Sequence, residues 1–275
     1  MIKIAILALA LIIASPSFGA QKPKAASLDF CADQYLLKLG DREQIIALSR
    51  GADERDSYMR EQAAGHKMIR PSREPIAALD VDMVLTQWGL QPRVQRDLNA
   101  RNIAITSIDD PRDFDAIKTS IQAVGDALGQ TDRANALIDE VDMRLDALSA
   151  RRTDNIKQSK TALYITPGGV TAGEGTLIDT MIRAAGFTNH ASTIGKKGWS
   201  SFSLEALLGA PPDIIITGFF NAGAEAQNNW SAGRHPVFAK IFAATPTLHL
   251  PADILSCGGW FSLEGAEAIA EMKFR

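Results

Sequence analysis

Two stretches of the chain share one pattern, EPIAALDVDMVLTQ at residues 74–87 and EALLGAPPDIIITG at residues 205–218. Each begins with a glutamate and a short apolar segment, reaches an aspartate eight positions after that glutamate, and continues as an apolar run that ends at a threonine. The first part of each stretch predicts a short helix, and the apolar run predicts a buried strand. The pattern indicates an internal repeat, with one copy in each half of the chain.

Strands and helices alternate on both sides of these copies. In the first half we expect strands over 24–30, 44–49, 82–87 and 103–109, with helices over 31–41 and 92–102. In the second half we expect strands over 161–166, 213–218 and 247–251, with helices over 176–186, 235–244 and 263–272. Such alternation predicts parallel sheets with helices on both faces. The predicted fold class is α/β, with two Rossmann-like parallel-sheet lobes.

A helical pattern separates the two halves. Apolar residues recur at helical spacing from Phe114 to Leu128, and again from Ala134 to Leu148. Gly125 and Gly129 weaken the pattern near its middle. We therefore expect a long, stiff connecting helix. The predicted division of the chain is a signal peptide over 1–20, an N-terminal α/β lobe over 21–110, a connecting helix over 111–151, and a C-terminal α/β lobe over 152–275.

The first twenty residues predict export from the cytoplasm. The segment MIKIAILALALIIASPSFGA has one lysine, an apolar run from Ile4 to Ala14, and then small residues. This arrangement is typical of a cleaved secretory signal peptide. A membrane anchor is the alternative, but the apolar run is short for crossing a bilayer.

The net charge and the number of cysteines indicate which classes of partner to expect and whether a disulfide can form. The formal net charge is −3 and there is no basic stripe, so we expect no nucleic-acid partner. The chain has two cysteines, Cys31 and Cys257. In an oxidising compartment two cysteines often pair, so a disulfide between them is predicted, and two separate buried thiols are the alternative.

The order of these elements resembles a known family. The segments SLDFCADQYLLKLG, EPIAALDVDMVLT, AGEGTLIDTMIRAAGFTNHA, FSLEALLGAPPDIIITG and CGGWFSLEGAEAI together are similar to periplasmic solute-binding proteins with a helical backbone between their lobes. That class serves ABC importers of cobalamin and of iron chelates such as siderophores and haem. The resemblance implies a ligand cleft between the lobes, a periplasmic location, and an ABC permease dimer in the inner membrane as partner. We expect a monomer.

The sequence offers little support for catalysis. Its four histidines lack metal-pair spacing, GGVTAGEG lacks the lysine of a phosphate loop, and no Gly-x-Ser-x-Gly motif occurs. We therefore predict no enzyme activity, no catalytic residues, no cofactor and no protein-held metal. An exported enzyme or sensor module on the same fold is the alternative function. A carrier of bare metal ions is a third possibility, which the lack of clustered histidine and aspartate ligands disfavours.

Aromatic residues near the ends of strands are the candidate ligand contacts. A flat macrocyclic chelate would be bound well by rigid aromatic faces, while core or hinge packing is the alternative role of each ring. The candidate set is Tyr58, Trp88, Trp199, Phe219, Phe220 and Trp260. The sequence does not decide between cobalamin, a ferric siderophore and haem, although Tyr58 could also ligate haem iron.

The glutamates of the repeat are candidates for docking to the permease. In the family that this chain resembles, one glutamate on each lobe forms salt bridges with arginines of the two permease subunits. The resemblance implies this role for Glu74 and Glu205. The alternative is that both are acids at helix N-termini, where the helix dipole favours them.

Overall fold

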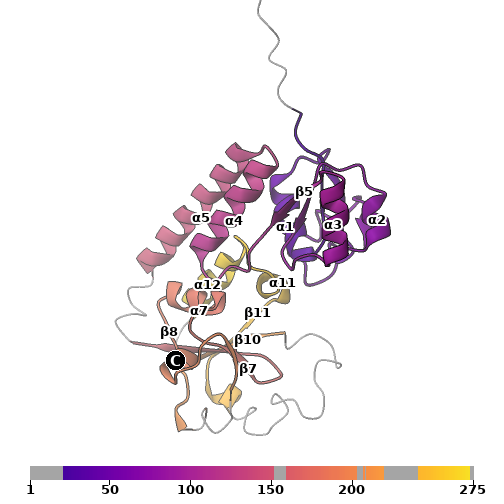
Figure 1. The fold of residues 1–275 in the computed structure, drawn as a ribbon. Coiled ribbons are helices and arrows are strands. Elements are labelled where there is room, and N and C mark those ends of the chain that lie inside the picture. Colours follow the sequence, from indigo (N-terminus) through magenta and orange to yellow (C-terminus); the bar gives the residue numbers. More distant parts are fainter. Residues whose placement is uncertain (1–20, 152–158, 203–206, 208, 220–240, 273–275) are drawn as a thin grey trace, which may run out of the picture.

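The computed structural model describes residues 21–151, 159–202, 207, 209–219 and 241–272. Within these residues the chain forms two lobes, each built on a parallel sheet (Figure 1). The predicted signal peptide over 1–20 lies outside the described residues, as do Glu205 and Phe220.

The N-terminal lobe holds a five-stranded parallel sheet in the order β3-β2-β1-β4-β5. Its strands are β1 (Ala25–Ser27), β2 (Ile45–Ser49), β3 (Met68–Ile69), β4 (Met83–Thr86) and β5 (Ala104–Ser107). Helix α1 (Phe30–Leu39) packs on one face. Helices α2 (Arg73–Ala77) and α3 (Pro92–Ala100) pack on the other, where Ile76, Val94 and Leu98 are buried. Both faces are covered, as predicted for a parallel sheet.

The C-terminal lobe holds a four-stranded parallel sheet in the order β11-β10-β6-β8. Its strands are β6 (Thr161–Ile165), β8 (Thr188–Asn189), β10 (Ile214–Gly218) and β11 (Thr247–Leu250). A small antiparallel pair, β7 (Val170–Ala172) and β9 (Trp199–Ser201), adjoins it. The helices here are α7 (Leu177–Ala184), α8 (His190–Thr193), α11 (Ala252–Leu255) and α12 (Ser262–Ala270). The sequence analysis does not predict strands β7 and β9.

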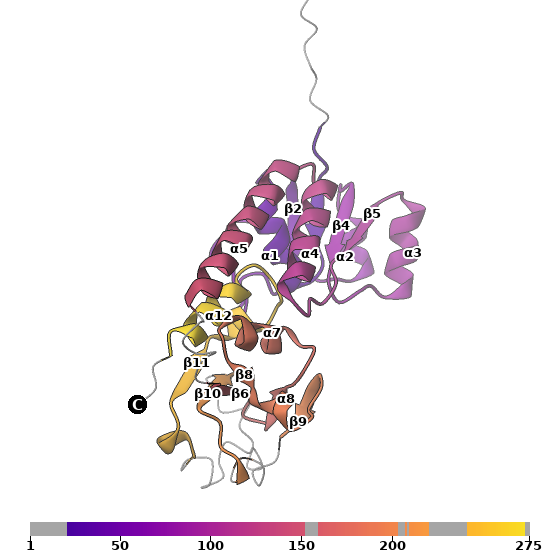
Figure 2. The ribbon, with the colours of Figure 1, turned by 90° about the vertical axis from the view of Figure 1, so that its left-hand side faces the viewer.

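The connector is two helices and not the single long helix expected over 111–151. Helix α4 (Phe114–Ala127) and helix α5 (Thr131–Arg151) lie side by side in both views (Figures 1 and 2). The break falls at Gly129, whose φ of 65° is in the left-handed region that favours glycine. A Cβ at Gly125 would collide with the side chain of Ala134, so this glycine lets the two helices approach closely. The glycines that weaken the helical pattern therefore mark a turn and a close contact.

One continuous hydrophobic core runs through both lobes. It joins residues of α1 in the first lobe and of α4 in the connector to residues of α7 and α12 in the second lobe. Tyr35, Tyr164 and Phe261 are among its largest fully buried side chains. In Figures 1 and 2, α7 and α12 lie between the two sheets. The lobes are therefore joined by packed side chains as well as by the connector.

In the part of the chain that the structure describes, no helix combines the length and the apolar character that a bilayer crossing requires.

Candidate functional site: a cavity between the lobes

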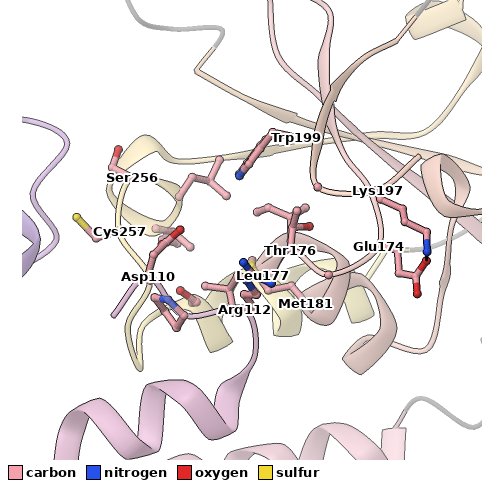
Figure 3. A pocket seen from close by; sticks show the side chains of 18 residues that line it. Asp110, Arg112, Glu174, Thr176, Leu177, Met181, Lys197, Trp199, Ser256 and Cys257 are labelled. Atoms are coloured by element: carbon pink, nitrogen blue, oxygen red, sulfur yellow. Dashed lines mark ion pairs between the residues drawn. The ribbon is translucent and has the colours of Figure 1, made fainter. Parts of the chain in front are cut away.

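A cavity of about 460 Å³ lies where the two lobes meet. The first lobe contributes residues 110–112, which follow β5, and the second contributes the loop before α7, the start of β9 and residues 254–258. Figure 3 shows the labelled side chains around this space, with the Trp199 ring on one side and Arg112 beside the α7 residues Leu177 and Met181 on the other. Ligands of parallel α/β folds gather beyond the carboxyl ends of strands, and this cavity lies in such a place.

The cavity has an apolar wall and several charged groups. Leu177, Met181, Ile254 and Leu255 supply the apolar wall. Arg112 is exposed and lies in the lining (Figure 3). Lys197 and Glu174 form an ion pair of 3.4 Å at the margin of the site. A cavity of this composition can hold an apolar ring and offer charged partners to polar groups at the edge of that ring.

A second, smaller hollow of about 270 Å³ lies on the other side of α11. It is lined by Arg55 and Arg60 of the first lobe and by Phe219, His249 and residues 251–253 of the second. Helix α11 supplies Ala252 and Asp253 to this hollow and Ile254 and Leu255 to the larger cavity. Both spaces are therefore lined by residues of the two lobes, and α11 contributes to each of them.

Trp199 and Phe219 are the predicted aromatic residues that line these spaces. Trp199 is 59% exposed, and its ring meets the edge of Tyr164 with ring centroids 6.0 Å apart. Phe219 follows β10 with a φ of 62° and lines the smaller hollow. Gly218 precedes it, and a Cβ there would come within 2.6 Å of the Tyr164 hydroxyl and of Leu255.

Trp88 lies at the carboxyl end of β4 and is 63% exposed. Its ring meets the edge of Phe30, with centroids 4.9 Å apart at an angle of 77°. Trp88 lines neither of the two spaces described above. It is nevertheless at the same edge of the N-terminal sheet from which residues 110–112 reach the larger cavity.

Tyr58 and Trp260 lie in the packed region beneath the cleft. Trp260 is 3% exposed and meets Tyr35, Tyr58 and Phe261 edge to face. Tyr58 stacks on Phe261 at 4.3 Å, and its hydroxyl donates to the Glu264 carboxylate. Burial, with this carboxylate beside it, raises the pKa of Tyr58. The Trp260 ring, predicted as a ligand contact, is thus packed in the core of the free protein, and its contact with a ligand stays a prediction. The hydroxyl of Tyr58 is engaged with Glu264.

A disulfide and a hydrogen bond tie the C-terminal segment, residues 252–270, to the first lobe. Cys31 and Cys257 are joined, with their Cα atoms 5.4 Å apart, and Cys257 lines the larger cavity. One residue later, the Gly258 carbonyl accepts a hydrogen bond of 3.1 Å from the buried Tyr35 hydroxyl. Two residues of the cavity lining, Cys257 and Gly258, are thus linked directly to α1 of the first lobe.

Two ion pairs reinforce the same junction. Arg60 Nη1 lies 2.7 Å from Asp253 Oδ2, so the pair connects the 50–66 region of the first lobe to α11. Arg144 of α5 binds both carboxylate oxygens of Glu267 in α12, at 3.0 and 2.8 Å. A bidentate pair of this kind fixes orientation as well as distance.

The first turns of α1 organise the loops of the first lobe. The Gln34 amide donates to Ser57 Oγ at 2.8 Å and accepts from the Met59 amide at 2.7 Å, which fixes the loop that carries Tyr58. Asp33 is fully buried and accepts from both the amide and the hydroxyl of Ser49, at 2.8 and 2.5 Å. Burial raises the pKa of Asp33 to about 6 against the opposing effect of these hydrogen bonds. Sequence reasoning missed this role, although polar residues on an otherwise apolar helix face were a visible signal.

Three buried polar atoms have no hydrogen-bond partner among the described residues: Gln87 Oε1, the Tyr164 hydroxyl and His190 Nε2. Burial also raises the pKa of Tyr164 and lowers that of His190. Within the described ranges, no group of three or more metal-ligating side chains comes together.

The sequence matches a family model described as periplasmic binding protein over residues 26–248. The chain belongs to this family. It is 23% identical to a cobalamin-binding protein of Halobacterium salinarum, over 74% of this chain and 55% of that relative. The chain thus spans about half the length of that protein. It is also 23% identical to an uncharacterized ABC transporter substrate-binding lipoprotein, YvrC, of Bacillus subtilis, over 86% of this chain and 74% of the relative.

The family's fold is also seen in solved structures. The periplasmic heme-binding protein RhuT from Roseiflexus sp. RS-1, in apo form, aligns with a TM-score of 0.68 and 21% identity, covering 91% of this chain and 96% of that one. At this identity the likeness shows the fold. The matched proteins are named as binding proteins, which agrees with the prediction that the chain is not an enzyme.

Proposed function

We propose that this chain is the substrate-binding protein of an ABC importer and that it captures a corrinoid or an iron chelate, such as a ferric siderophore or haem, between its lobes. The observation that carries the proposal is the inter-lobe cavity of about 460 Å³ with the exposed Trp199 ring at its wall. The ring is more than half exposed, and aromatic side chains that line concave spaces of this kind commonly contact ligands. A second ring that is more than half exposed, that of Trp88, belongs to the other lobe.

The names of the matched proteins support this ligand class. One relative is named for cobalamin binding and one structural neighbour for haem binding. Both ligands are planar macrocycles with polar groups around the ring, which suits a cavity with an apolar wall, exposed aromatics and charges at its margin. An export signal over residues 1–20 and a periplasmic location belong to the same proposal.

A titration tests the proposal. Cyanocobalamin, haemin and a ferric hydroxamate are added separately to the protein that lacks residues 1–20, while tryptophan emission and the melting temperature are followed. At least one of them should quench the emission and raise the melting temperature by mass action. Trp199→Ala should weaken binding of that compound at least tenfold.

Met143→Ala is the matched control, because Met143 is a 65% exposed apolar side chain on α5 that lines neither space in the cleft. It should leave the affinity unchanged. If none of the three compounds shifts either signal at high micromolar concentration, the proposed ligand class is wrong. If Met143→Ala weakens binding as much as Trp199→Ala, the cavity is not the binding site.

The same proposal includes docking to a permease dimer through Glu74 and Glu205. Glu74 is exposed in the first turn of α2, on the side of the N-terminal sheet opposite α1. It therefore does not line either space in the cleft. Glu205 lies outside the described residues, so its role rests on the sequence repeat and on the family resemblance.

A further inference from the structure

Asp29 binds two parts of the first lobe with one carboxylate. Its Oδ1 accepts the Ala32 amide at 2.9 Å and so caps α1. Its Oδ2 accepts the Gln87 amide at 2.7 Å and lies 3.0 Å from the Thr86 hydroxyl. The residue is 8% exposed. Helix capping requires only the first of these contacts, so the second oxygen has a separate task.

That task concerns the loop after β4. The Trp88 amide also points at Asp29 Oδ2, at 3.4 Å, so a single oxygen receives three donors from residues 86–88. Hydrogen bonds from backbone amides to a buried carboxylate are strong ones. They fix the backbone at the position from which the indole leaves the chain.

Trp88 is attached to the start of α1 through both its backbone and its ring. The ring is 63% exposed, and the aromatic contact that it makes is to Phe30, the residue next to Asp29. Gly89, with φ of 77°, follows it, and a Cβ at Gly89 would meet nothing within 4 Å. Among the described residues, two supports of Trp88, the Asp29 carboxylate and the Phe30 ring, come from the start of α1. A hydrogen bond of 3.1 Å from the Thr86 hydroxyl to the Gly89 carbonyl spans the loop itself.

We propose that Asp29 is a positioning residue: its carboxylate holds the 86–88 loop so that Trp88 stands fixed and exposed at the edge of the cleft, preorganised for a ligand. The part of this inference that concerns the ligand rests on the proposed function. Preorganisation raises affinity because the cost of ordering the loop is met during folding and not during binding.

Asp29→Ser is the test variant. Serine keeps a side-chain oxygen that can cap α1, but it is one atom shorter and lacks the second oxygen that reaches the loop. Asp113→Ser is the matched control, because Asp113 caps α4 in the same manner, through the Ala116 amide at 2.8 Å, and is exposed. Both variants lose a capping carboxylate, but only Asp29→Ser also loses the hydrogen bonds to residues 86–88.

Two measurements are made on the free protein. Hydrogen exchange at the Gln87 amide should be at least tenfold faster in Asp29→Ser than in the wild type, and unchanged in Asp113→Ser. With 5-fluorotryptophan incorporated, the fluorine resonance of Trp88, assigned through Trp88→Phe, should shift or broaden in Asp29→Ser alone. If both readouts match the wild type, the positioning role is overturned, whatever ligand the protein binds.

The third measurement uses whichever of cyanocobalamin, haemin and the ferric hydroxamate the wild type binds. Asp29→Ser should weaken binding, and Asp29→Ser combined with Trp88→Ala should bind no more weakly than Trp88→Ala alone. If Trp88→Ala weakens binding and Asp29→Ser does not, ligand binding does not require Asp29 to hold the 86–88 loop, and the proposed role of Asp29 in ligand binding is wrong. If the wild type binds none of them, the proposed function fails, while hydrogen exchange still decides the claim about the loop.

Discussion

The ring of Pro111 lies directly against the backbone of Gly258, so closely that a Cβ at residue 258 would collide with it. Pro111 opens the connector from the first lobe and Gly258 belongs to the C-terminal segment, so the contact joins the lobes at the wall of the cavity. The carbonyl of the same glycine accepts the Tyr35 hydroxyl. Gly258 is therefore needed for a close approach and not for an unusual backbone angle, since its φ is not in the left-handed region.

Gly258→Ala should destabilise the protein by about 1–3 kcal/mol, the range for overpacking a tight site. It should also weaken ligand binding, because the cavity wall must move to make room. Gly168→Ala is the control, since a Cβ there meets nothing within 4 Å. Urea unfolding of both variants measures the effect. Equal stability of the two alanine variants would show that the lobes separate here at no cost.

Reducing the bond between Cys31 and Cys257 should lower the stability substantially. The bond closes a loop across a sequence separation of 226 residues. On the chain-entropy account such a loop contributes about 5 kcal/mol, which is an upper figure. Cys31→Ser combined with Cys257→Ser should lower the free energy of unfolding by up to that amount. Thiol titration of the denatured, unreduced protein should find no free thiol, and two free thiols would contradict the pairing.

Asp33 should make the protein less stable as the pH rises from about 4 to about 6. Its pKa is raised to about 6 by burial, from 3.8. The folded state therefore holds the proton more tightly than the unfolded state between these values, and folding is favoured on the acid side. A shift of this size corresponds to about 3 kcal/mol.

Asp33→Asn removes this titration. Urea unfolding from pH 4 to pH 8 should show the variant gaining stability relative to the wild type as the pH rises, and the gain should level off above pH 7. Asp109→Asn, at an exposed carboxyl, should show no such trend. A difference between Asp33→Asn and the wild type that is independent of pH would mean that Asp33 titrates normally.

Charge reversal at Glu74 and Glu205 should abolish uptake without affecting ligand capture. A surface ion pair contributes little by itself, about 0–1 kcal/mol, but two pairs acting together can set the orientation of docking. Glu74→Arg with Glu205→Arg should therefore block growth on the transported compound, each single reversal should impair it in part, and affinity in solution should be unchanged. Glu43→Arg, at another exposed glutamate, serves as the control. Normal transport by the double variant would exclude the docking role.

The two lobes could be predicted from the sequence because buried parallel strands appear as short apolar runs and the helices as apolar residues at helical spacing. The apolar run at 214–218 and the periodic residues after Phe114 were both found at the predicted places. The division of the connector was less clear, since Gly129 only weakens a helix in isolation, and the turn is fixed by the packing of α4 on α5.

The site was harder to predict because it depends on contacts between distant segments. Trp199 and Trp260 each occur in glycine-rich surroundings, and nothing local separates them. Trp260 is buried because Tyr35, Tyr58 and Phe261 surround it, and two of these three come from the other lobe. Arg112 was overlooked for the same reason, since it becomes a cavity residue only through the opposing α7.

The long separation of Cys31 and Cys257 also governs when the bond can form. If the chain is exported while it is being made, Cys31 reaches the oxidising compartment roughly ten to fifty seconds before its partner at synthesis rates of 5–20 residues per second. The chain has two cysteines in total, so no wrong intramolecular bond exists for it to make in that interval. The unwanted reaction is a disulfide between the unpaired Cys31 residues of two chains. Dimers cross-linked through Cys31 should therefore accumulate when expression is fast and oxidation is early, and slowing either step should reduce their amount.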